Sequence, residues 1–400
     1  METVGKLAPL GFGFMRLPLK DADDPTSIDI DKVCELVDIF MDAGFTYFDS
    51  ARGYHGCKSE WALRKALVER YPRDSFTIAT KLPAWLAKDA DEARAMFDTS
   101  LEECGIDYFD YYLLHNLGET LTPPFDEYGL WEFCAEKKAE GKIKKFGFSI
   151  HDNAEELERV LDAHPEVDFV QLQINYVDWE SDIIQSRKCY EVCQERGLPV
   201  VIMEPVKGGT LVKLPDSVAD ILRAAEPGAP LASWALRFAG SLPNVIAVLS
   251  GMNTPEMVAE NAAIMRGGVP LTPAEYEVID AARAALESLP GVPCTDCRYC
   301  VKGCPEGVHI NNIMQSLNIY DQMGDAYRAQ ENYDWNTGDG KASACIQCGA
   351  CESVCPQHIE IVSQLERAVK LFEWHPAPSP PAPRALRFSE TRGVQVNFTL

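Results

Sequence analysis

Residues 31–49 read DKVCELVDIFMDAGFTYFD, an amphipathic stretch followed by a short apolar run. Val33, Leu36 and Phe40 recur at helical spacing and share one face. Gly44 follows this stretch, and glycine commonly ends a helix because it adopts the left-handed conformation cheaply. Residues 46–49 then have the length and composition of a short buried strand. The segment is therefore predicted to form a helix and then a strand.

The same unit recurs between Leu10 and Met265. Most of the apolar runs are continuous rather than alternating, as expected of strands buried on both faces. Helical patterns lie between the runs, and those at 89–104 and 181–196 also stop at glycine. The repetition predicts an α/β fold over residues 1–285, a (β/α)8 TIM barrel, with an open doubly wound sheet as the alternative. The predicted strands are 10–15, 46–49, 76–81, 110–115, 146–149, 169–173, 199–203 and 245–250.

Composition narrows the classes of partner. The chain has 61 acidic and 37 basic residues, a formal net charge of −24, and no run of Lys and Arg. Contact with a phosphate backbone needs such a run, so we expect no nucleic acid partner. An acidic surface is mostly a solvated one, and it could also steer a basic redox partner. We expect no membrane contact and a cytoplasmic location, because neither a secretory signal nor a stretch of about 18 apolar residues is found.

Cysteines are concentrated near the C-terminus. Eight of the 14 lie between Cys294 and Cys355, in two copies of the spacing Cys-x2-Cys-x2-Cys-x3-Cys-Pro. In this spacing three thiolates bind one four-iron, four-sulfur (4Fe-4S) cluster and the fourth binds the neighbouring cluster. We therefore predict two 4Fe-4S clusters. Zinc is the alternative, although a zinc knuckle requires neither the third cysteine nor the proline. The predicted ligand sets are Cys294, Cys297, Cys300 and Cys355 for one cluster, and Cys345, Cys348, Cys351 and Cys304 for the other.

A domain boundary is predicted where Pro and Gly replace the helical pattern, near residue 286. Apolar residues recur at helical spacing at 310–317 and 361–369, so residues 286–374 are predicted to form a small, mainly helical dicluster ferredoxin-like domain. Residues 375–400 form a Pro-rich tail that we expect to be extended or disordered. The remaining cysteines are expected to be buried core residues: Cys34, Cys57, Cys104, Cys134, Cys189 and Cys193.

Polar side chains follow three consecutive predicted strands. Asp49, Lys81 and His115 end these strands, and Tyr54 lies five residues after Asp49. We expect all four to converge, because active sites of such barrels lie at the carboxyl ends of the strands. A lysine ammonium beside the phenol would stabilise its anion, so Tyr54 could protonate a carbonyl oxygen that His115 orients. Singly, each residue has an ordinary structural role; jointly, they favour proton transfer. Three tryptophans are further candidates for the barrel mouth, with core positions equally ordinary: Trp85, Trp131 and Trp179.

Three segments around these residues, 48–54, 80–82 and 113–116, resemble the motifs of the aldo-keto reductases. The resemblance extends from about Leu10 to Asn261. It implies a nicotinamide-dependent reductase of a small carbonyl substrate. In that family pattern Tyr54 is the acid, Lys81 and Asp49 tune it, and His115 orients the substrate.

The cofactor-side motifs match in part. Gly251 and Met257 stand where the family has the cations that hold a 2′-phosphate, so the choice between NADPH and NADH stays open. Lys207 could supply a phosphate-binding charge, with a solvated loop lysine as the alternative. The resemblance implies four nicotinamide-cofactor contacts: Ser149, Gln171, Glu260 and Asn261.

The two halves together resemble a bacterial branch of aldo-keto reductases with iron–sulfur domains. They predict an oxidoreductase that reduces a carbonyl substrate and carries its clusters for electron transfer. A hydride carries two electrons whereas each cluster passes one, so direct coupling would call for a flavin, for which the sequence holds no convincing motif. The alternatives are a ferredoxin-linked reductase, supplied by a ferredoxin or other redox partner, and an electron-transfer subunit whose barrel is mainly a binding platform.

Overall fold

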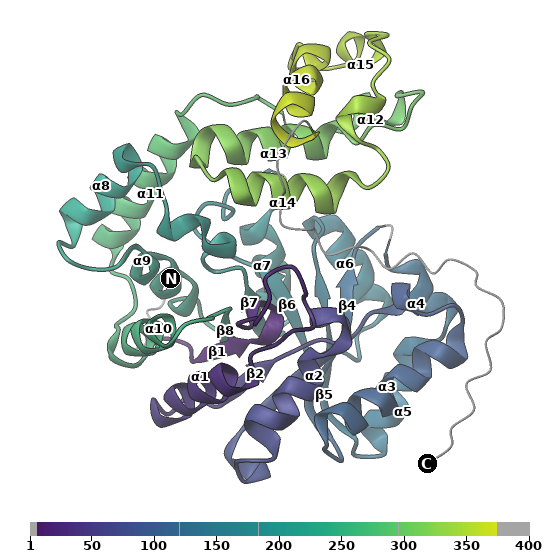
Figure 1. The fold of residues 1–400 in the computed structure, drawn as a ribbon, viewed down its shortest axis with the longest axis vertical. Helices are drawn as coiled ribbons and strands as arrows, with labels where there is room; N and C mark the ends of the chain where they lie inside the picture. Colours follow the sequence, from purple (N-terminus) through teal and green to yellow (C-terminus); the bar gives the residue numbers. More distant parts are fainter. Residues whose placement is uncertain (1–5, 120, 183, 295, 374–400) are drawn as a thin grey trace.

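The computed structural model describes residues 6–119, 121–182, 184–294 and 296–373, so the tail predicted at 375–400 lies outside the described residues. The first part of the chain is a closed barrel of parallel strands in sequence order, in which β8 pairs with β1 (Figure 1). The predicted barrel is thus confirmed and the open sheet is excluded. The strands are β1 (Leu10–Gly13), β2 (Tyr47–Asp49), β3 (Thr77–Leu82), β4 (Phe109–Leu117), β5 (Ile143–Ile150), β6 (Phe169–Gln173), β7 (Val200–Met203) and β8 (Val245–Ser250).

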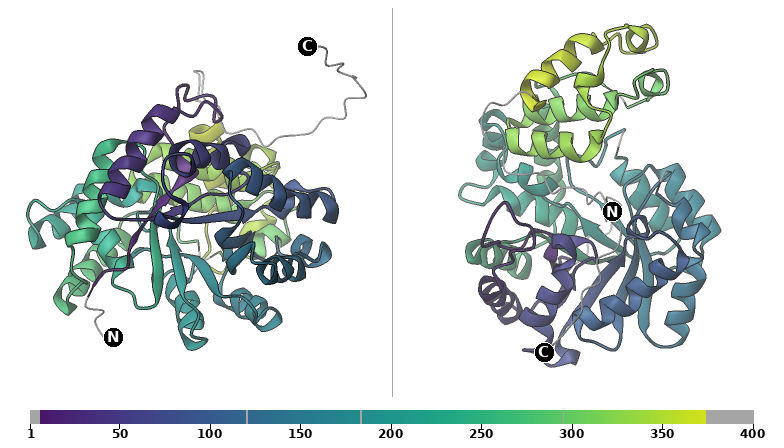
Figure 2. Two further views of the ribbon diagram at one scale, coloured as in Figure 1. Left: turned by 90° about the horizontal axis from the view of Figure 1, so that it is seen from below. Right: turned by 45° about the vertical axis from the view of Figure 1, so that its right-hand side comes forward.

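Helices cover the outside of the barrel (Figures 1 and 2). The helix predicted at 181–196 begins five residues later than expected. Gln185 has a left-handed backbone with a φ of 54°, and Ser181 N donates to Asp178 O in a turn, so the helical path starts only at Ser186. The helices of this part are α1 (Ile30–Asp42), α2 (Ser59–Leu63), α3 (Ala90–Cys104), α4 (Pro123–Glu127), α5 (Leu130–Ala139), α6 (Ala154–Ala163), α7 (Ser186–Glu195), α8 (Asp216–Ala225), α9 (Leu231–Gly240), α10 (Pro255–Gly267) and α11 (Pro273–Glu287).

Apolar side chains fill both sides of the barrel wall. Tyr47, Leu113, Phe169 and Leu249 belong to a cluster that fills the interior, and a larger cluster lies between the strands and the helices. This double burial is why most strands read as continuous apolar runs. With the interior filled, the polar side chains that end the strands gather at one face of the ring.

The C-terminal domain, from α12 to residue 373, has an apolar core of its own that includes Ile313, Leu317, Tyr333 and Leu365. Its α13–α14 hairpin lies between the barrel and the two short helices that lie within the cysteine motifs, α12 and α15 (Figures 1 and 2). Asn318 anchors the incoming chain, because its side chain accepts from Val292 N at 2.6 Å and donates to Val292 O at 2.8 Å. The helices are α12 (Tyr299–Lys302), α13 (Ile310–Met323), α14 (Ala326–Thr337), α15 (Ala350–Ser353) and α16 (Ile361–Ala368).

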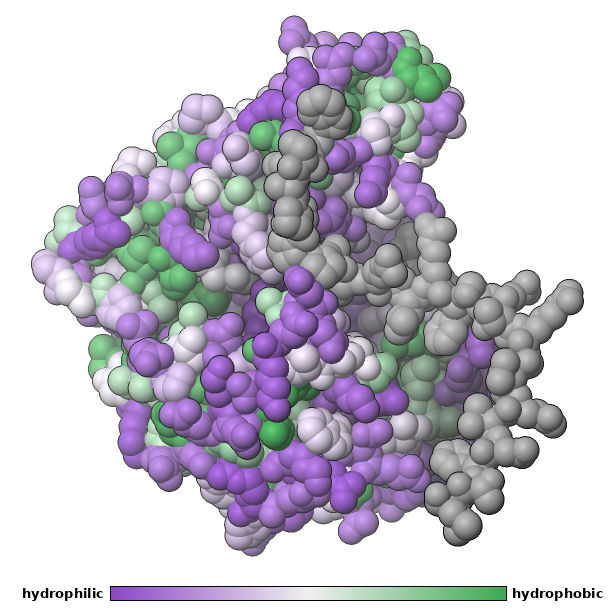
Figure 3. Space-filling model, in the orientation of Figure 1, coloured by the Kyte–Doolittle hydropathy of each residue, from purple (hydrophilic) through white to green (hydrophobic). Residues whose placement is uncertain are grey.

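Hydrophilic side chains cover most of the face seen in the space-filling view, with smaller hydrophobic areas among them (Figure 3). Within the described ranges, no helix is both long and apolar enough to cross a membrane.

Candidate active site and cysteine-lined hollows

The four residues predicted to converge do meet at the carboxyl ends of β2, β3 and β4. Lys81 Nζ lies 2.5 Å from Asp49 Oδ1 and 3.4 Å from the Tyr54 hydroxyl. Lys81 also donates to the backbone oxygen of Ser50 at 2.7 Å. The Tyr54 and His115 rings stand edge to face with their centroids 5.6 Å apart. One ammonium therefore joins the carboxylate to the phenol, and the imidazole lies beside the phenol.

Lys81 and Asp49 form a buried ion pair, with side-chain exposures of 2% and 5%. Burial alone would lower the pKa of Lys81, but the Asp49 carboxylate and the Tyr54 phenol outweigh it and raise that pKa. Burial raises the pKa of Asp49, and the Lys81 ammonium opposes this shift. The pair therefore depends on its mutual attraction to stay charged in a dry site.

The phenol and the imidazole are both neutral in this environment. Burial raises the pKa of Tyr54, and the Lys81 ammonium acts in the opposite direction. Burial, then the charge of Lys81, holds the pKa of His115 well below its usual range. Nδ1 of His115 is buried and has no hydrogen-bond partner among the described residues. The Tyr54 phenol thus keeps its proton, and the Lys81 ammonium lies where it would stabilise the anion.

A strained turn carries Tyr54. The next three residues, His55, Gly56 and Cys57, all have a positive φ, between 51° and 69°. His55 fixes this turn, because its Nε2 accepts from Leu17 N at 3.2 Å while its Nδ1 lies 3.0 Å from the Pro25 oxygen. This role of His55 was not predicted, since the local sequence offers only a His-Gly pair directly after Tyr54.

Ser149 and Gln171, predicted as cofactor contacts, lie on β5 and β6 near this group. Ser149 Oγ accepts from Asn116 N at 2.7 Å. Gln171 Nε2 donates to Asp49 Oδ2 at 3.3 Å, whereas its Oε1 is buried without a partner in the part of the chain that the structure describes. A buried acceptor left unpaired is costly, so this atom fits a bound group that brings an N–H.

The other two predicted contacts lie on α10. Asn261 is buried and donates to Ser250 Oγ at 3.1 Å, at the end of β8, whereas Glu260 is exposed. Met257 is 47% exposed on the same helix and carries no charge. Lys207 is not a solvated loop lysine, because its ammonium pairs with the buried Asp178 carboxylate at 2.5 Å.

Only one of the three candidate tryptophans lies beside the site. Trp85 is 42% exposed, and its ring centroid is 5.1 Å from that of His115. Trp131 is buried and stacks on His164 at 3.6 Å. Trp179 packs on Tyr190 and Phe238. Of the two alternatives, Trp131 and Trp179 take the packing role, since Trp131 belongs to the core and Trp179 packs against it.

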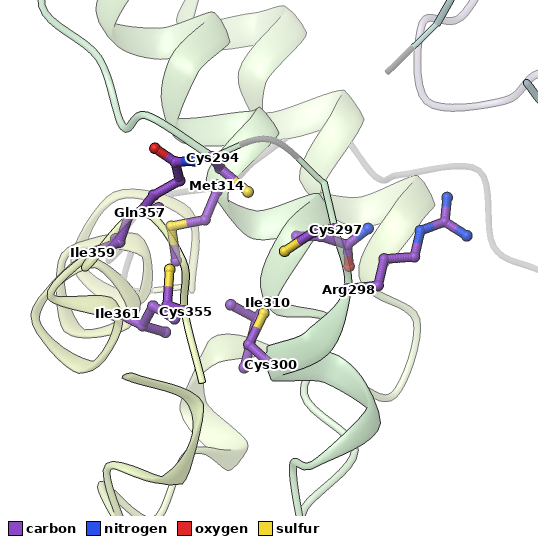
Figure 4. A pocket seen from close by; sticks show the side chains of 11 residues that line it. Cys294, Cys297, Arg298, Cys300, Ile310, Met314, Cys355, Gln357, Ile359 and Ile361 are labelled. Carbon is purple, nitrogen blue, oxygen red and sulfur yellow. The ribbon is translucent and has the colours of Figure 1, made fainter. Parts of the chain in front are cut away.

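The eight clustered cysteines line two hollows in the C-terminal domain. In the first, four cysteine side chains point into the same space (Figure 4). The second is lined by four cysteines as well. Backbone N–H groups of Val308 and Gln347 donate to Cys304 and Cys345 sulfurs at 3.4 Å, a contact that stabilises thiolates. The hollows are lined by Cys294, Cys297, Cys300 and Cys355, and by Cys304, Cys345, Cys348 and Cys351.

These sets are the ones expected when the fourth cysteine of each motif crosses to the other hollow. Four cysteines, three from one motif and one from the other, suit a 4Fe-4S cluster, whereas a zinc knuckle has no need of this third cysteine at the same spacing. Of the six scattered cysteines, four are buried as expected, whereas Cys34 and Cys57 are partly exposed.

Residues 9–284 match the family model described as aldo/keto reductase family, and residues 293–360 match that of the 4Fe-4S dicluster domain. The chain is 28% identical over 235 residues to Protein REDOX 2 of Catharanthus roseus. This match covers 51% of this chain and 68% of that protein. It is 24% identical over 310 residues to the NADH-specific methylglyoxal reductase of Escherichia coli, in a match that covers 65% of this chain and 90% of that protein.

Solved structures agree on the fold of the barrel. An aldo-keto reductase from Bacillus halodurans in its holo form has a TM-score of 0.55 at 24% identity, covering 70% of this chain and 96% of that one. An aldo-keto reductase from Klebsiella pneumoniae in complex with NADPH has a TM-score of 0.55 at 22% identity, covering 70% and 95%.

Proposed function

Because the chain belongs to the aldo/keto reductase family and carries a C-terminal 4Fe-4S dicluster domain, we propose that it reduces a small carbonyl compound with a nicotinamide cofactor. The observation that carries this proposal is the Lys81 ammonium held between Asp49 and Tyr54, with neutral His115 beside the phenol. This arrangement supplies a proton donor, a group that stabilises the donor's anion and a hydrogen-bond donor for the carbonyl oxygen.

The chain's own residues handle the proton. Tyr54 donates its hydroxyl proton to the carbonyl oxygen, and the Lys81 ammonium 3.4 Å away stabilises the phenolate that remains. Asp49 keeps that ammonium charged and in place. His115 donates an N–H to the same carbonyl oxygen and fixes its position. The nicotinamide, when bound, supplies the hydride to the carbonyl carbon.

Gln171 and Ser149 are the residues we assign to the carboxamide of the nicotinamide. The unpaired Gln171 Oε1 fits an amide N–H, and Ser149 lies at the end of the neighbouring strand. Glu260 and Asn261 on α10 are assigned to the adenosine end. Uncharged Met257 and Gly251 offer nothing for a 2′-phosphate, so they give no preference for NADPH.

We place the barrel domain at residues 1–285 and the C-terminal domain at residues 286–374. The C-terminal domain is proposed to hold two 4Fe-4S clusters. Each hollow supplies four sulfurs, three from one motif and one from the other. The clusters pass single electrons, to or from a ferredoxin-like or other redox partner.

If the fourth cysteine of each motif binds the cluster in the other hollow, two matched variants should each damage a different cluster. Cys304→Ala removes a ligand from the hollow of Cys345, Cys348 and Cys351, and Cys355→Ala removes one from the other hollow. We expect each variant to lose or convert one cluster and to keep the other. Iron content and electron paramagnetic resonance (EPR) of the reduced proteins measure this, and Cys57→Ala, outside both hollows, is the control. The same cluster lost in both variants would contradict the crossed arrangement.

The function is tested on anaerobically purified protein, titrated separately with NADH and NADPH while EPR follows the clusters. A panel of small aldehydes and ketones is assayed in parallel. We expect nucleotide binding and consumption of nucleotide with at least one carbonyl compound. If neither nucleotide binds but a reduced ferredoxin-like donor supports turnover, the ferredoxin-linked reductase replaces this proposal. Cluster reduction without any carbonyl turnover would identify the chain as an electron-transfer subunit.

A further inference from the structure

Helix α14 of the C-terminal domain contacts the barrel at the carboxyl ends of two strands. Arg16 follows β1 and lies 3.8 Å from Glu331 of α14, while Glu204 follows β7 and lies 4.0 Å from Arg328 of the same helix. Glu331 and Arg328 also pair closely with each other. All four side chains are less than one-third exposed. A row of four side chains with alternating charge therefore joins α14 to the barrel, on the face of the barrel that holds Tyr54. We call this contact between α14 and the barrel the seam.

The guanidinium of Arg328 lies directly on the backbone of Gly208. A Cβ added at Gly208 would stand 2.3 Å from Arg328 Nη2, so no larger residue fits without displacing the arginine. The neighbouring Gly209 has a similar positive φ, 97° against 62°, but a Cβ there meets nothing within 4 Å. Substitutions at these two glycines therefore distinguish loss of the Arg328 contact from backbone strain in the loop.

The loop under Arg328 is fixed from the barrel side as well. Lys207 pairs with the buried Asp178 at 2.5 Å, and Asn175 donates to the backbone oxygen of Glu204 at 3.2 Å. The loop after β7 is thus held between the barrel below and α14 above. A rigid loop keeps the Glu204 carboxylate in one place.

The charge of Glu204 reaches the proton-transfer group. After burial and the nearer charges of Lys81 and Asp49, Glu204 raises the pKa of Tyr54. It also raises the pKa of His151, although burial lowers that pKa overall. The groups that bear on Tyr54 are therefore Lys81, Asp49 and Glu204, and only Glu204 is paired with the C-terminal domain.

We propose that Arg328 is a positioning residue that the C-terminal domain contributes to the barrel site: it seats α14 on the loop after β7 and balances Glu204, so that proton transfer by Tyr54 depends on the docked domain. The catalytic part of this inference rests on the proposed carbonyl reduction; the docking part does not. The C-terminal domain then controls the barrel's chemistry even where no electron passes between the two sites.

A double-mutant cycle on the full chain with its clusters tests the catalytic part. In Arg328→Gln, Glu204 is unbalanced, so Tyr54 becomes a weaker acid. We expect kcat at neutral pH to fall about three- to tenfold and the alkaline limb of its pH profile to move up by about half a unit to one unit. In a Glu204→Gln background the same arginine substitution should have a clearly smaller effect, because only the direct charge effect of the lost guanidinium remains and no carboxylate is left to position. Equal effects of Arg328→Gln in the two backgrounds would overturn the proposal.

Hydrogen exchange tests the docking part without turnover. Gly208→Ala displaces Arg328, so amides of α14 and of residues 204–209 should exchange about tenfold faster or more, with EPR of the clusters unchanged. Gly209→Ala carries at least as much backbone strain, since its φ of 97° lies farther from the left-handed region open to L residues, and it should leave α14 as protected as in the parent protein. Equal protection of α14 in both variants would contradict the proposed docking of α14 through Arg328. If the parent protein reduces no carbonyl compound while this exchange difference is found, the proposed function fails and the docking stands.

Discussion

Tyr54→Phe is expected to lower kcat for carbonyl reduction by about 100- to 10,000-fold, the range typical for loss of a general acid. The substitution removes the hydroxyl that lies 3.4 Å from Lys81 Nζ and keeps the ring that packs edge to face against His115. Nucleotide binding should change little, because Gln171 and Ser149 are untouched. The measurement is steady-state turnover under anaerobic conditions, together with EPR of both clusters, which should match the parent protein.

Tyr47→Phe is the matched control for this prediction. Tyr47 is one residue before Phe48 on β2, and its hydroxyl is buried inside the barrel without a partner among the described residues. Removing such a hydroxyl should be neutral or slightly stabilising, because no hydrogen bond is lost. Comparable turnover in Tyr54→Phe and in the parent protein would contradict the assigned acid, whereas equal losses in both tyrosine variants would indicate a general packing effect.

The sequence was sufficient for the barrel because local signals repeat there. Strands β6 and β8 have the predicted bounds, since each is a short, mostly apolar run whose ends leave little freedom in placing it. Asp49, Lys81 and His115 were predictable for the same reason, because each lies at or near the carboxyl end of a strand and parallel strands in a barrel end at one face. The cysteine spacing in turn predicted which sulfurs share a hollow.

What could not be predicted depends on packing between distant parts of the chain. No spacing indicates that Arg328 lies on Gly208, since this contact requires the relative placement of two domains. The start of α7 was predicted too early because the left-handed residue before it is Gln185, whereas a glycine there would have indicated a break in the helix. Whether Trp131 lies at the mouth or in the core could not be decided from the sequence, because the residue that stacks on it, His164 at the end of α6, is distant in the chain.

Lys81→Met is expected to abolish carbonyl reduction and also to destabilise the fold by about 3–5 kcal/mol, because it leaves the buried Asp49 carboxylate without its counter-charge. The free energy of unfolding is measured anaerobically with denaturant, and turnover is measured separately. The double variant Asp49→Asn/Lys81→Met removes both charges. It should recover most of the stability, since no buried charge is left uncompensated, but none of the activity.

The loss of stability in Lys81→Met should depend on pH in a defined direction. Burial already raises the pKa of Asp49, and loss of the opposing ammonium raises it further. The folded variant then keeps a proton on Asp49 at pH values where the unfolded chain, with a carboxyl pKa of about 3.9, has released it. Its free energy of unfolding therefore falls as the pH rises from about 4 through the folded-state pKa of Asp49, and the deficit relative to the parent protein is largest at neutral pH. A deficit that stays constant from about pH 4 to 7 would mean that lost packing of the lysine side chain, rather than an unbalanced carboxylate, sets the stability of this pair.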